Sequence, residues 1–224
     1  MKQLKSPKLW LLILVGIAIS FFVYRQLNGK GKQDKTQATE AKPLKVEYIS
    51  TDFKENAFTD GNELALLKEL KICDTTLVDG QLGACSPRFF RFFKLNDAVS
   101  LKNAFLLLVN GAAYPNDPKN FKSRRILIFE REKGSLVLSN TIKGNLIERR
   151  KNGPSTYDDI VIRFRLDDYD EAYHCLFKWK NGRYEYESCE ELFSYYCKGK
   201  VKPELKDSVS IEVKKILYDE KLLY

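Results

Sequence analysis

Short hydrophobic runs, many of them alternating with polar residues, recur along the chain from residue 45 onward. Turn-forming pairs such as Lys133-Gly134 and Asn181-Gly182 separate several of them. The runs occupy residues 45–50, 88–95, 104–109, 124–131, 135–142, 145–150, 159–166, 172–179, 183–188 and 209–218. Strand-length runs joined by short polar turns are typical of an antiparallel meander. We therefore predict a mainly β fold, a sandwich or barrel-like sheet.

Helical periodicity is confined to one or two short segments. In residues 60–73 the leucines recur near helical spacing, and Asn62 can cap the N-terminus of a helix. Residues 189–197 (CEELFSYYC) can form a second short helix. Residues 88–94 (RFFRFFK) place phenylalanines on both faces of a strand, which predicts a central strand buried on both sides.

Residues 175–189 (CLFKWKNGRYEYESC) predict a β-hairpin, because an Asn-Gly pair between alternating apolar residues favours a two-residue type I′ turn. With Asn-Gly as the turn, Trp179 lies opposite Tyr184, and Phe177 lies opposite Tyr186. This register gathers the aromatic side chains on one face of the hairpin and most of the charges on the other.

The same register, continued without interruption, decides which cysteines can pair. It places Cys175 on the aromatic face, opposite Ser188. It places Cys189 on the other face, opposite His174. Sulfurs on opposite faces cannot reach the Cβ separation of about 4 Å that a disulfide needs, so Cys175 is predicted to be a free, buried thiol.

The chain has five cysteines, so at least one is unpaired within the molecule. The short closures that remain as disulfide candidates are Cys73 with Cys85 and Cys189 with Cys197. The alternative is that all five are reduced thiols in a cytosolic protein. No CxxC or Cys/His metal spacing is present, so the cysteines do not indicate a metal site or a cofactor.

The N-terminus has the layout of an export signal. Lys2, Lys5 and Lys8 precede an uncharged apolar run over residues 9–24, which is long enough to span a bilayer. We predict an uncleaved signal-anchor over residues 1–24, that is, a single transmembrane helix. A short basic N-terminus stays in the cytoplasm, so the rest of the chain is predicted to be extracytoplasmic, in the periplasm or outside the cell. The alternative is a protein secreted after signal cleavage.

Most of the positive charge lies before the folded domain. The chain has a net charge of +8, of which residues 1–45 carry +7, leaving +1 for residues 46–224. Residues 25–45 are basic and poor in large apolar side chains, which predicts a flexible linker. Residues 46–224 are enough for one β-rich domain. A domain with so little excess of positive charge is not expected to bind nucleic acid.

Residues 124–140 (RRILIFEREKGSLVLSN) and 158–188 (DDIVIRFRLDDYDEAYHCLFKWKNGRYEYES) pair hydrophobic strands with Lys-Gly or Asn-Gly turns and aromatic return strands. In this style of hairpin, the chain over residues 87–190 resembles uncharacterised exported bacterial β-domains. The resemblance implies export and a β fold. No activity is assigned to that group, so the resemblance implies none for this chain.

Residue types that carry out catalysis are few. The only histidine, His174, is predicted to lie beside Cys189, an arrangement known from cysteine nucleophiles but here lacking a predicted orienting residue. The weak metal candidates are the acidic residues Asp167, Asp168, Asp170 and Glu171, which a solvated turn also explains. Asp158 and Asp159 are interpreted in the same way. No phosphate-binding glycine loop, GxSxG or HExxH motif is present.

These patterns predict a membrane-anchored extracytoplasmic domain with no catalytic residues and no cofactor. Its expected partners are the membrane, through a single span, and a protein or glycan of the cell envelope. The competing hypothesis is an extracytoplasmic hydrolase that uses carboxylates. A concave cleft with convergent acids favours the enzyme, and an exposed aromatic surface favours binding.

Overall fold

The computed structural model describes residues 45–50, 52–53, 57–58, 60–79, 81–113, 124–153, 156–166, 171–194 and 198–223. Leu44–Tyr224 forms one compact unit. The predicted signal-anchor at residues 1–24 and the predicted linker, apart from its last residue, lie outside the described residues. Across the described ranges, no helix has both the length and the apolar character needed to cross a bilayer.

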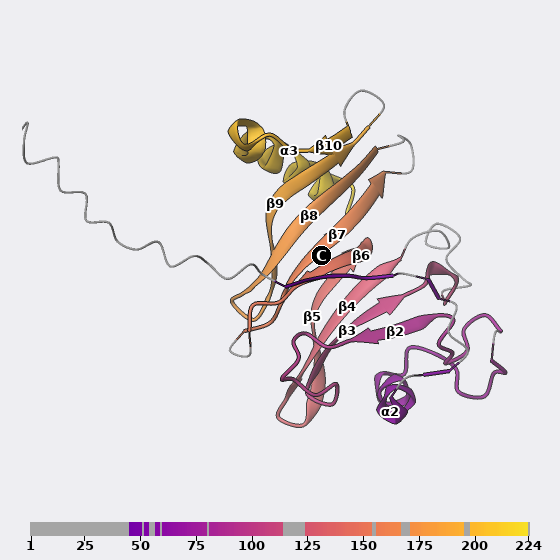
Figure 1. Ribbon diagram of the computed structural model, residues 1–224. Helices are drawn as coiled ribbons and strands as arrows, with labels where there is room; N and C mark the ends of the chain where they lie inside the picture. Colours follow the sequence, from indigo (N-terminus) through magenta and orange to yellow (C-terminus); the bar gives the residue numbers. More distant parts are fainter. Residues whose placement is uncertain are drawn as a thin grey trace, which may run out of the picture. The chain divides into compact units, whose positions relative to one another are not determined.

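The described residues form a mainly β domain of two antiparallel sheets, as the sequence predicts (Figure 1). The strands are β1 (Val46–Tyr48), β2 (Phe90–Phe93), β3 (Ala104–Val109), β4 (Arg125–Glu132), β5 (Ser135–Lys143), β6 (Asn145–Arg150), β7 (Asp159–Leu166), β8 (Glu171–Lys180), β9 (Arg183–Phe193) and β10 (Lys198–Lys200). The helices are α2 (Gly61–Leu70) and α3 (Lys206–Asp219), with 3-10 turns at Gly111–Ala113 and Pro203–Leu205. One sheet has the order β1-β6-β7-β8-β9-β10 and curls into a half-barrel, and the other has the order β2-β3-β4-β5.

Within the four-stranded sheet, the inner strand β3 is buried on both faces. Leu106 and Leu108 of β3 face the six-stranded sheet and share a cluster with Ile162 and with residues of β8. Phe105 and Leu107 of β3 pack on the other side, with α2. Helix and sheets therefore form three layers, and the shared core lies between the two sheets.

Helix α2 forms where the leucine spacing predicts it. Its N-cap is Asp60 rather than Asn62, because the Asp60 carboxylate accepts the backbone N–H of Asn62 at 2.8 Å and completes a capping box with Glu63. Leu66 and Leu67 are buried against the four-stranded sheet. The helix is thus fixed at its start by the cap and along its length by an apolar face.

Helix α3 corrects the strand predicted at residues 209–218. Val213 and Leu217, four residues apart, are buried in the shared core, whereas Ile211 is 68% exposed. A strand would have buried Ile211 with Val213, so the alternation of β-branched residues was a misleading signal. The helix lies against the sheet at β9, where the Tyr186 hydroxyl donates to the Ser210 carbonyl at 3.0 Å (Figure 1).

Two further predictions of local structure are wrong. The aromatic run RFFRFFK forms β2, which is an edge strand of the four-stranded sheet and not a central one. Its aromatic side chains do meet both faces, because Phe90 packs toward α2 and Phe93 toward the shared core. The helix predicted at residues 189–197 is instead a continuation of β9 as far as Phe193. Both segments pair with a neighbouring strand, and that tertiary pairing overrides the local pattern.

Candidate functional site

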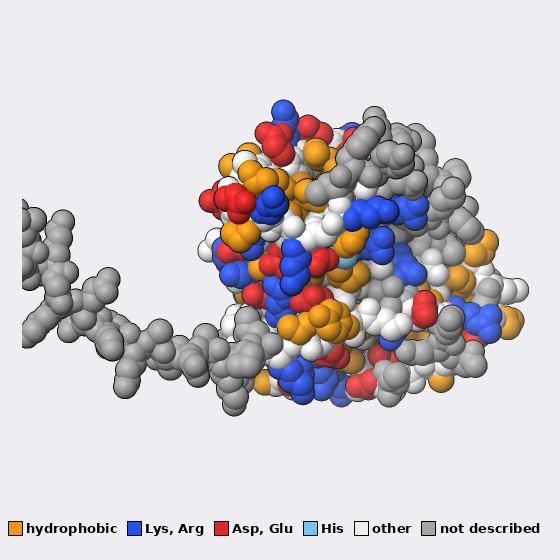
Figure 2. Space-filling view, turned by 45° about the horizontal axis from the view of Figure 1, so that its top comes forward, with side chains coloured by type: hydrophobic (Ala, Val, Ile, Leu, Met, Phe, Trp, Pro, Cys, Tyr) orange, Lys and Arg blue, Asp and Glu red, His pale blue; other side chains and the backbone are white. Residues whose placement is uncertain are grey.

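A cleft of about 810 Å³ lies on the face of the six-stranded sheet opposite the shared core. Its walls come from β1, β6, β7, β8, β9, β10 and the start of α3. Because successive strand residues point to opposite faces, Arg163 and His174 line the cleft while Ile162 and Cys175 lie in the core. Figure 2 shows a face of the molecule on which basic and acidic side chains lie next to one another with hydrophobic side chains between them.

Two β-bulges bring extra carboxylates to β9. In the ladder with β8, Phe177 pairs with Tyr186 but Leu176 pairs with Ser188, which leaves Glu187 as an extra residue. A second shift, between His174 and Cys175, leaves Glu190 as another. A bulge sets two residues against one and re-aims the side chains beside it. The second bulge places Glu190 and its neighbour Glu191 on the cleft together.

The centre of the cleft is an ion-pair network around Arg150. Its guanidinium donates to both carboxylate oxygens of Glu190, at 3.0 and 2.5 Å, and also pairs with Glu148. Lys206 approaches Glu190 at 3.7 Å. Burial opposes ionisation of Glu190, but the hydrogen bonds and charges of Arg150 and Lys206 together lower the pKa of that carboxyl. Glu190 is therefore held as an ionised acceptor.

Beside this network lies a histidine that is held neutral. His174 Nδ1 lies 2.8 Å from a carboxylate oxygen of Glu191, and the imidazole packs against the Phe193 ring with 4.6 Å between centroids. Burial lowers the pKa of His174 despite the favourable charge of Glu191. In the neutral ring Nδ1 carries the proton toward the carboxylate, which leaves the lone pair on Nε2. Within the described ranges, Nε2 is buried and has no hydrogen-bond partner.

Three groups on the cleft remain available to a ligand. Arg163 and Lys200 are exposed, and within the described part of the chain neither belongs to an ion pair. The Tyr48 ring lines the cleft and is 81% exposed. The cleft thus offers two cationic donors and an aromatic surface.

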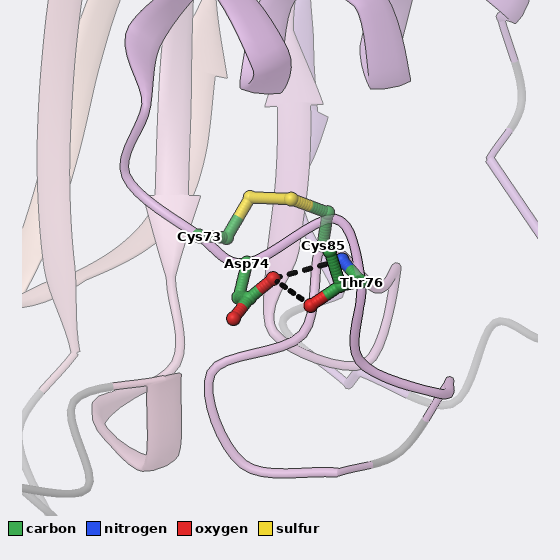
Figure 3. The surroundings of a disulfide bond; sticks show 4 residues. All are labelled: Cys73, Asp74, Thr76 and Cys85. Carbon is green, nitrogen blue, oxygen red and sulfur yellow. Dashed lines mark hydrogen bonds between the residues drawn. A yellow bond between two sulfur atoms is a disulfide. The ribbon is translucent and has the colours of Figure 1, made fainter.

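The disulfide predicted between Cys73 and Cys85 is present, with 5.1 Å between the Cα atoms (Figure 3). It closes the loop that follows α2. Inside this loop the Asp74 carboxylate accepts the backbone N–H of Thr76 at 2.8 Å and its hydroxyl at 2.6 Å, and these bonds lower the pKa of Asp74. The disulfide and the turn together fix a segment that has few buried apolar residues.

The other cysteines correct the predicted register. Cys175 and Cys189 are direct cross-strand partners on the core face, whereas an uninterrupted register would pair Cys175 with Ser188. The bulge at Glu187 is the physical reason, because one extra residue turns Ser188 and Cys189 to the opposite face, as far as the second bulge at Glu190. Both cysteines are buried and free in this structure, and the bridge from Cys189 to Cys197 stays a prediction. Cys197 itself lies outside the described residues.

Because of the corrected register, His174 and Cys189 are not cross-strand neighbours as predicted. His174 pairs with Glu191 on the cleft face, while Cys189 lies in the core. The two side chains are therefore on opposite faces of the sheet, and no Cys–His nucleophile pair is assembled. The orienting carboxylate that the sequence did not reveal is Glu191.

The acidic residues that were interpreted as parts of solvated turns have partners in the protein wherever the structure describes them. Asp167, Asp168 and Asp170 lie outside the described residues, and Glu171 accepts the Tyr173 hydroxyl at 2.7 Å. Asp158 is 1% exposed and lies 3.4 Å from Arg149, so interpreting it as a surface turn residue was wrong. Within the described part of the chain, no group of three or more potential ligands is arranged to hold a metal ion.

In comparisons with known proteins, no family model, curated protein or solved structure matches the chain. The cleft itself was missed in the sequence because its residues come from six strands and one helix. A partial signal was present in the charged positions that alternate with core residues on β6 and β7, such as Arg150 and Arg163. That alternation marks an outward face but does not show that the sheet curls around it.

Proposed function

We propose that this chain is a single-pass membrane protein whose domain lies outside the cytoplasm and binds an envelope glycan in the cleft. The N-terminal run at residues 9–24, preceded by lysines, supports the anchor and the orientation. The Cys73–Cys85 disulfide supports an oxidising compartment, because structural disulfides persist outside the cytosol.

The binding function is supported mainly by one observation: some polar side chains of the cleft already have partners within the protein, and others do not. Glu190 and Glu191 are held by Arg150 and His174, whereas Arg163 and Lys200 are exposed and belong to no ion pair within the described residues. A sugar hydroxyl can accept a hydrogen bond from either cation. An exposed aromatic ring offers an apolar surface with a polar tip, which suits the mixed faces of a saccharide. These features favour a glycan over a protein partner.

A hydrolase is the second candidate, and one observation favours it. Glu148, Glu190 and Glu191 converge on one cleft, as a carboxylate mechanism requires. Such a mechanism also needs a proton donor, a carboxyl whose pKa is raised so that it stays protonated. The pKa of Glu190 is shifted the other way, and its carboxylate is bonded to Arg150 through both oxygens. The arrangement favours binding without turnover.

Retention of envelope polysaccharide tests the binding function. The full chain, purified in detergent micelles, is incubated with polysaccharide purified from the envelope of the producing cells, and the bound fraction is separated by sedimentation. Tyr48→Ala and Arg163→Ala should each weaken binding roughly tenfold, about 1.4 kcal/mol. The matched controls are Tyr218→Ala and Arg88→Ala, which remove an exposed tyrosine and an exposed arginine outside the cleft.

Three outcomes would count against this function. Polysaccharide retained equally by the cleft and control variants would exclude the cleft as the site. A crosslinker placed at position 48 that captures an envelope protein rather than saccharide would favour a protein partner. Release of new reducing ends by the wild type, abolished by Glu190→Gln, would favour the hydrolase. Location is tested separately by protease treatment of sealed spheroplasts, which should digest the domain without lysis.

A further inference from the structure

The core of the six-stranded sheet holds two cysteines side by side. Cys175 of β8 and Cys189 of β9 are direct partners in the antiparallel ladder, and both have no exposed surface. Both belong to the shared hydrophobic cluster between the sheets. The bulge at Glu187 brings the two sulfurs to the same face of the sheet. Without it, the two cysteines would lie on opposite faces.

Their spacing suits a covalent bond. Cross-strand partners in an antiparallel ladder have Cα atoms about 4.5–5.5 Å apart. A disulfide needs a Cα separation of about 4.4–6.8 Å, so the strands do not have to move. The bonded pair Cys73–Cys85 has a Cα separation of 5.1 Å, which falls in the same range.

The two thiols also influence each other. Burial raises the pKa of Cys175, whereas a hydrogen bond from Cys175 lowers the pKa of Cys189. The thiolate is the attacking species in thiol–disulfide exchange. The opposite shifts show that the two sulfurs are in contact in the folded domain.

We propose that Cys175 and Cys189 are joined by a disulfide in the exported protein, in addition to Cys73–Cys85. The thiolate of one cysteine attacks a disulfide oxidant, RSSR, forming a mixed disulfide with SR and releasing one thiolate. The thiolate of the other cysteine then attacks the protein sulfur of that mixed disulfide and releases the second. The protein loses two protons and two electrons, and one RSSR becomes two RSH. Since both sulfurs are buried in the folded domain, exchange takes place before the core closes. The inference rests on the extracytoplasmic location proposed above.

The bond would act on the cleft from the core side. Cys175 directly follows His174, and Cys189 directly precedes Glu190, so the cross-link lies at the bulge that presents His174, Glu190 and Glu191. A covalent tie at that point fixes the register of β9 against β8. It would hold the carboxylates of the cleft in place even when the surrounding strands fluctuate.

Peptide mapping of the full chain under non-reducing conditions tests the proposal. Cells are quenched with acid, which halts thiol exchange, and the precipitated protein is dissolved in denaturant at neutral pH with N-ethylmaleimide so that buried free thiols are blocked as well. The purified protein is then digested with trypsin. Trypsin separates residues 166–178, with Cys175, from residues 184–198, which contain both Cys189 and Cys197. A second digestion, after glutamate, cuts between these last two cysteines at Glu190 and Glu191 and so assigns the bond. We expect most of the Cys175 peptide to be linked to the Cys189 peptide and released by a reductant.

Two variants sharpen the assignment. Cys197→Ser should leave the link in place, because Cys197 takes no part in it. Cys175→Ala, which keeps a small apolar side chain in the core, should leave Cys189 free to react with N-ethylmaleimide once the protein is denatured. A bond between Cys189 and Cys197 in the wild type, lost in Cys197→Ser, would overturn the proposal.

The remaining outcomes separate this proposal from the proposed location. Alkylated Cys175 and Cys189 beside a bonded Cys73–Cys85 pair would overturn the second disulfide but leave the oxidising compartment intact. Alkylation of all the cysteines in the denatured protein would overturn both. A linked Cys175–Cys189 peptide supports both.

Discussion

The side-chain amide of Asn140 pairs with the backbone of Tyr184 as a residue of an adjacent strand would. Its Nδ2 donates to the Tyr184 carbonyl at 3.0 Å, and its Oδ1 accepts the Tyr184 N–H at 2.7 Å. Asn140 belongs to β5 of the four-stranded sheet and Tyr184 to β9 of the six-stranded sheet. One buried amide thus joins the two sheets where neither strand has a backbone partner for these groups.

Asn140→Ala should destabilise the domain more than most single substitutions. It leaves a buried N–H and a buried C=O without partners, at a cost of about 1–3 kcal/mol for each group. The measurement is urea unfolding followed by tryptophan fluorescence. Asn103→Ala, at an exposed position, is the control and should change the free energy of unfolding by less than about 0.5 kcal/mol. Equal stability of the two variants would mean that water satisfies the Tyr184 backbone.

Gly144→Ala should also destabilise the domain, for a steric reason. Gly144 connects β5 to β6, and a Cβ there would lie 2.6 Å from Ile162 Cγ2 and 3.3 Å from the Arg163 carbonyl oxygen. Relief requires a shift of the core or of a paired backbone, which costs about 1–3 kcal/mol. Gly61→Ala, with nothing within 4 Å of the added Cβ, is the matched control. It should be neutral or slightly stabilising in thermal unfolding, and a similar loss in both variants would contradict the steric argument.

His174 should make stability fall as the pH drops below neutral. Burial lowers its pKa in the folded state, so the unfolded chain binds the proton first as the pH falls through the unperturbed value of about 6.5. The free energy of unfolding therefore decreases from pH 7 toward pH 5. Because the chain has one histidine, His174→Asn should flatten this part of the profile. A wild type that instead gains stability on acidification would show that the attraction of Glu191 outweighs burial.

The Cys73–Cys85 disulfide should stabilise the loop that it closes. The cysteines are 12 residues apart in the sequence, and a loop of this size gives about 3 kcal/mol through restriction of the unfolded chain. The double variant Cys73→Ala/Cys85→Ala should lower Tm by about 2–4 °C for each kcal/mol lost. Calorimetry under non-reducing conditions measures the change. An unchanged Tm would mean that the loop does not take part in the cooperative transition.

Most strands were predictable because each carries a local signal, whereas the short β10, with the sequence KGK, carries none and was not predicted. The hairpin turn at Asn181 and the pairs Trp179–Tyr184 and Phe177–Tyr186 follow from turn chemistry and from alternation, and all are present. The prediction failed past Phe177, because a bulge leaves no mark in the hydrophobic pattern. One uncounted residue, Glu187, then exchanged the faces of Ser188 and Cys189, until the second bulge at Glu190 restored the original alternation.

Helix α3 was missed because its sequence satisfies two periods at once. Val213 fits a strand together with Ile211 and a helix together with Leu217, and only packing against the sheet decides between them. The cleft was beyond sequence reasoning for a different reason. His174 was identified, but Glu191 becomes its cross-strand partner only through the two bulges of β9, and Arg150 reaches the same cleft only through the strand order.

The two bulge residues of β9, Glu187 and Glu190, contribute charge at the surface of the sheet without changing which side chains fill the core. Removing Glu190 would restore regular alternation between Cys189 and Glu191, so every inward position would keep its side chain while Arg150 would lose its main counter-ion. Removing Glu187 would act likewise and affect only Lys178 and Lys180 at the surface. Insertions or deletions at these two positions can therefore change the charge that the outer face of the sheet presents to a ligand, while the same apolar side chains remain packed on the inner face.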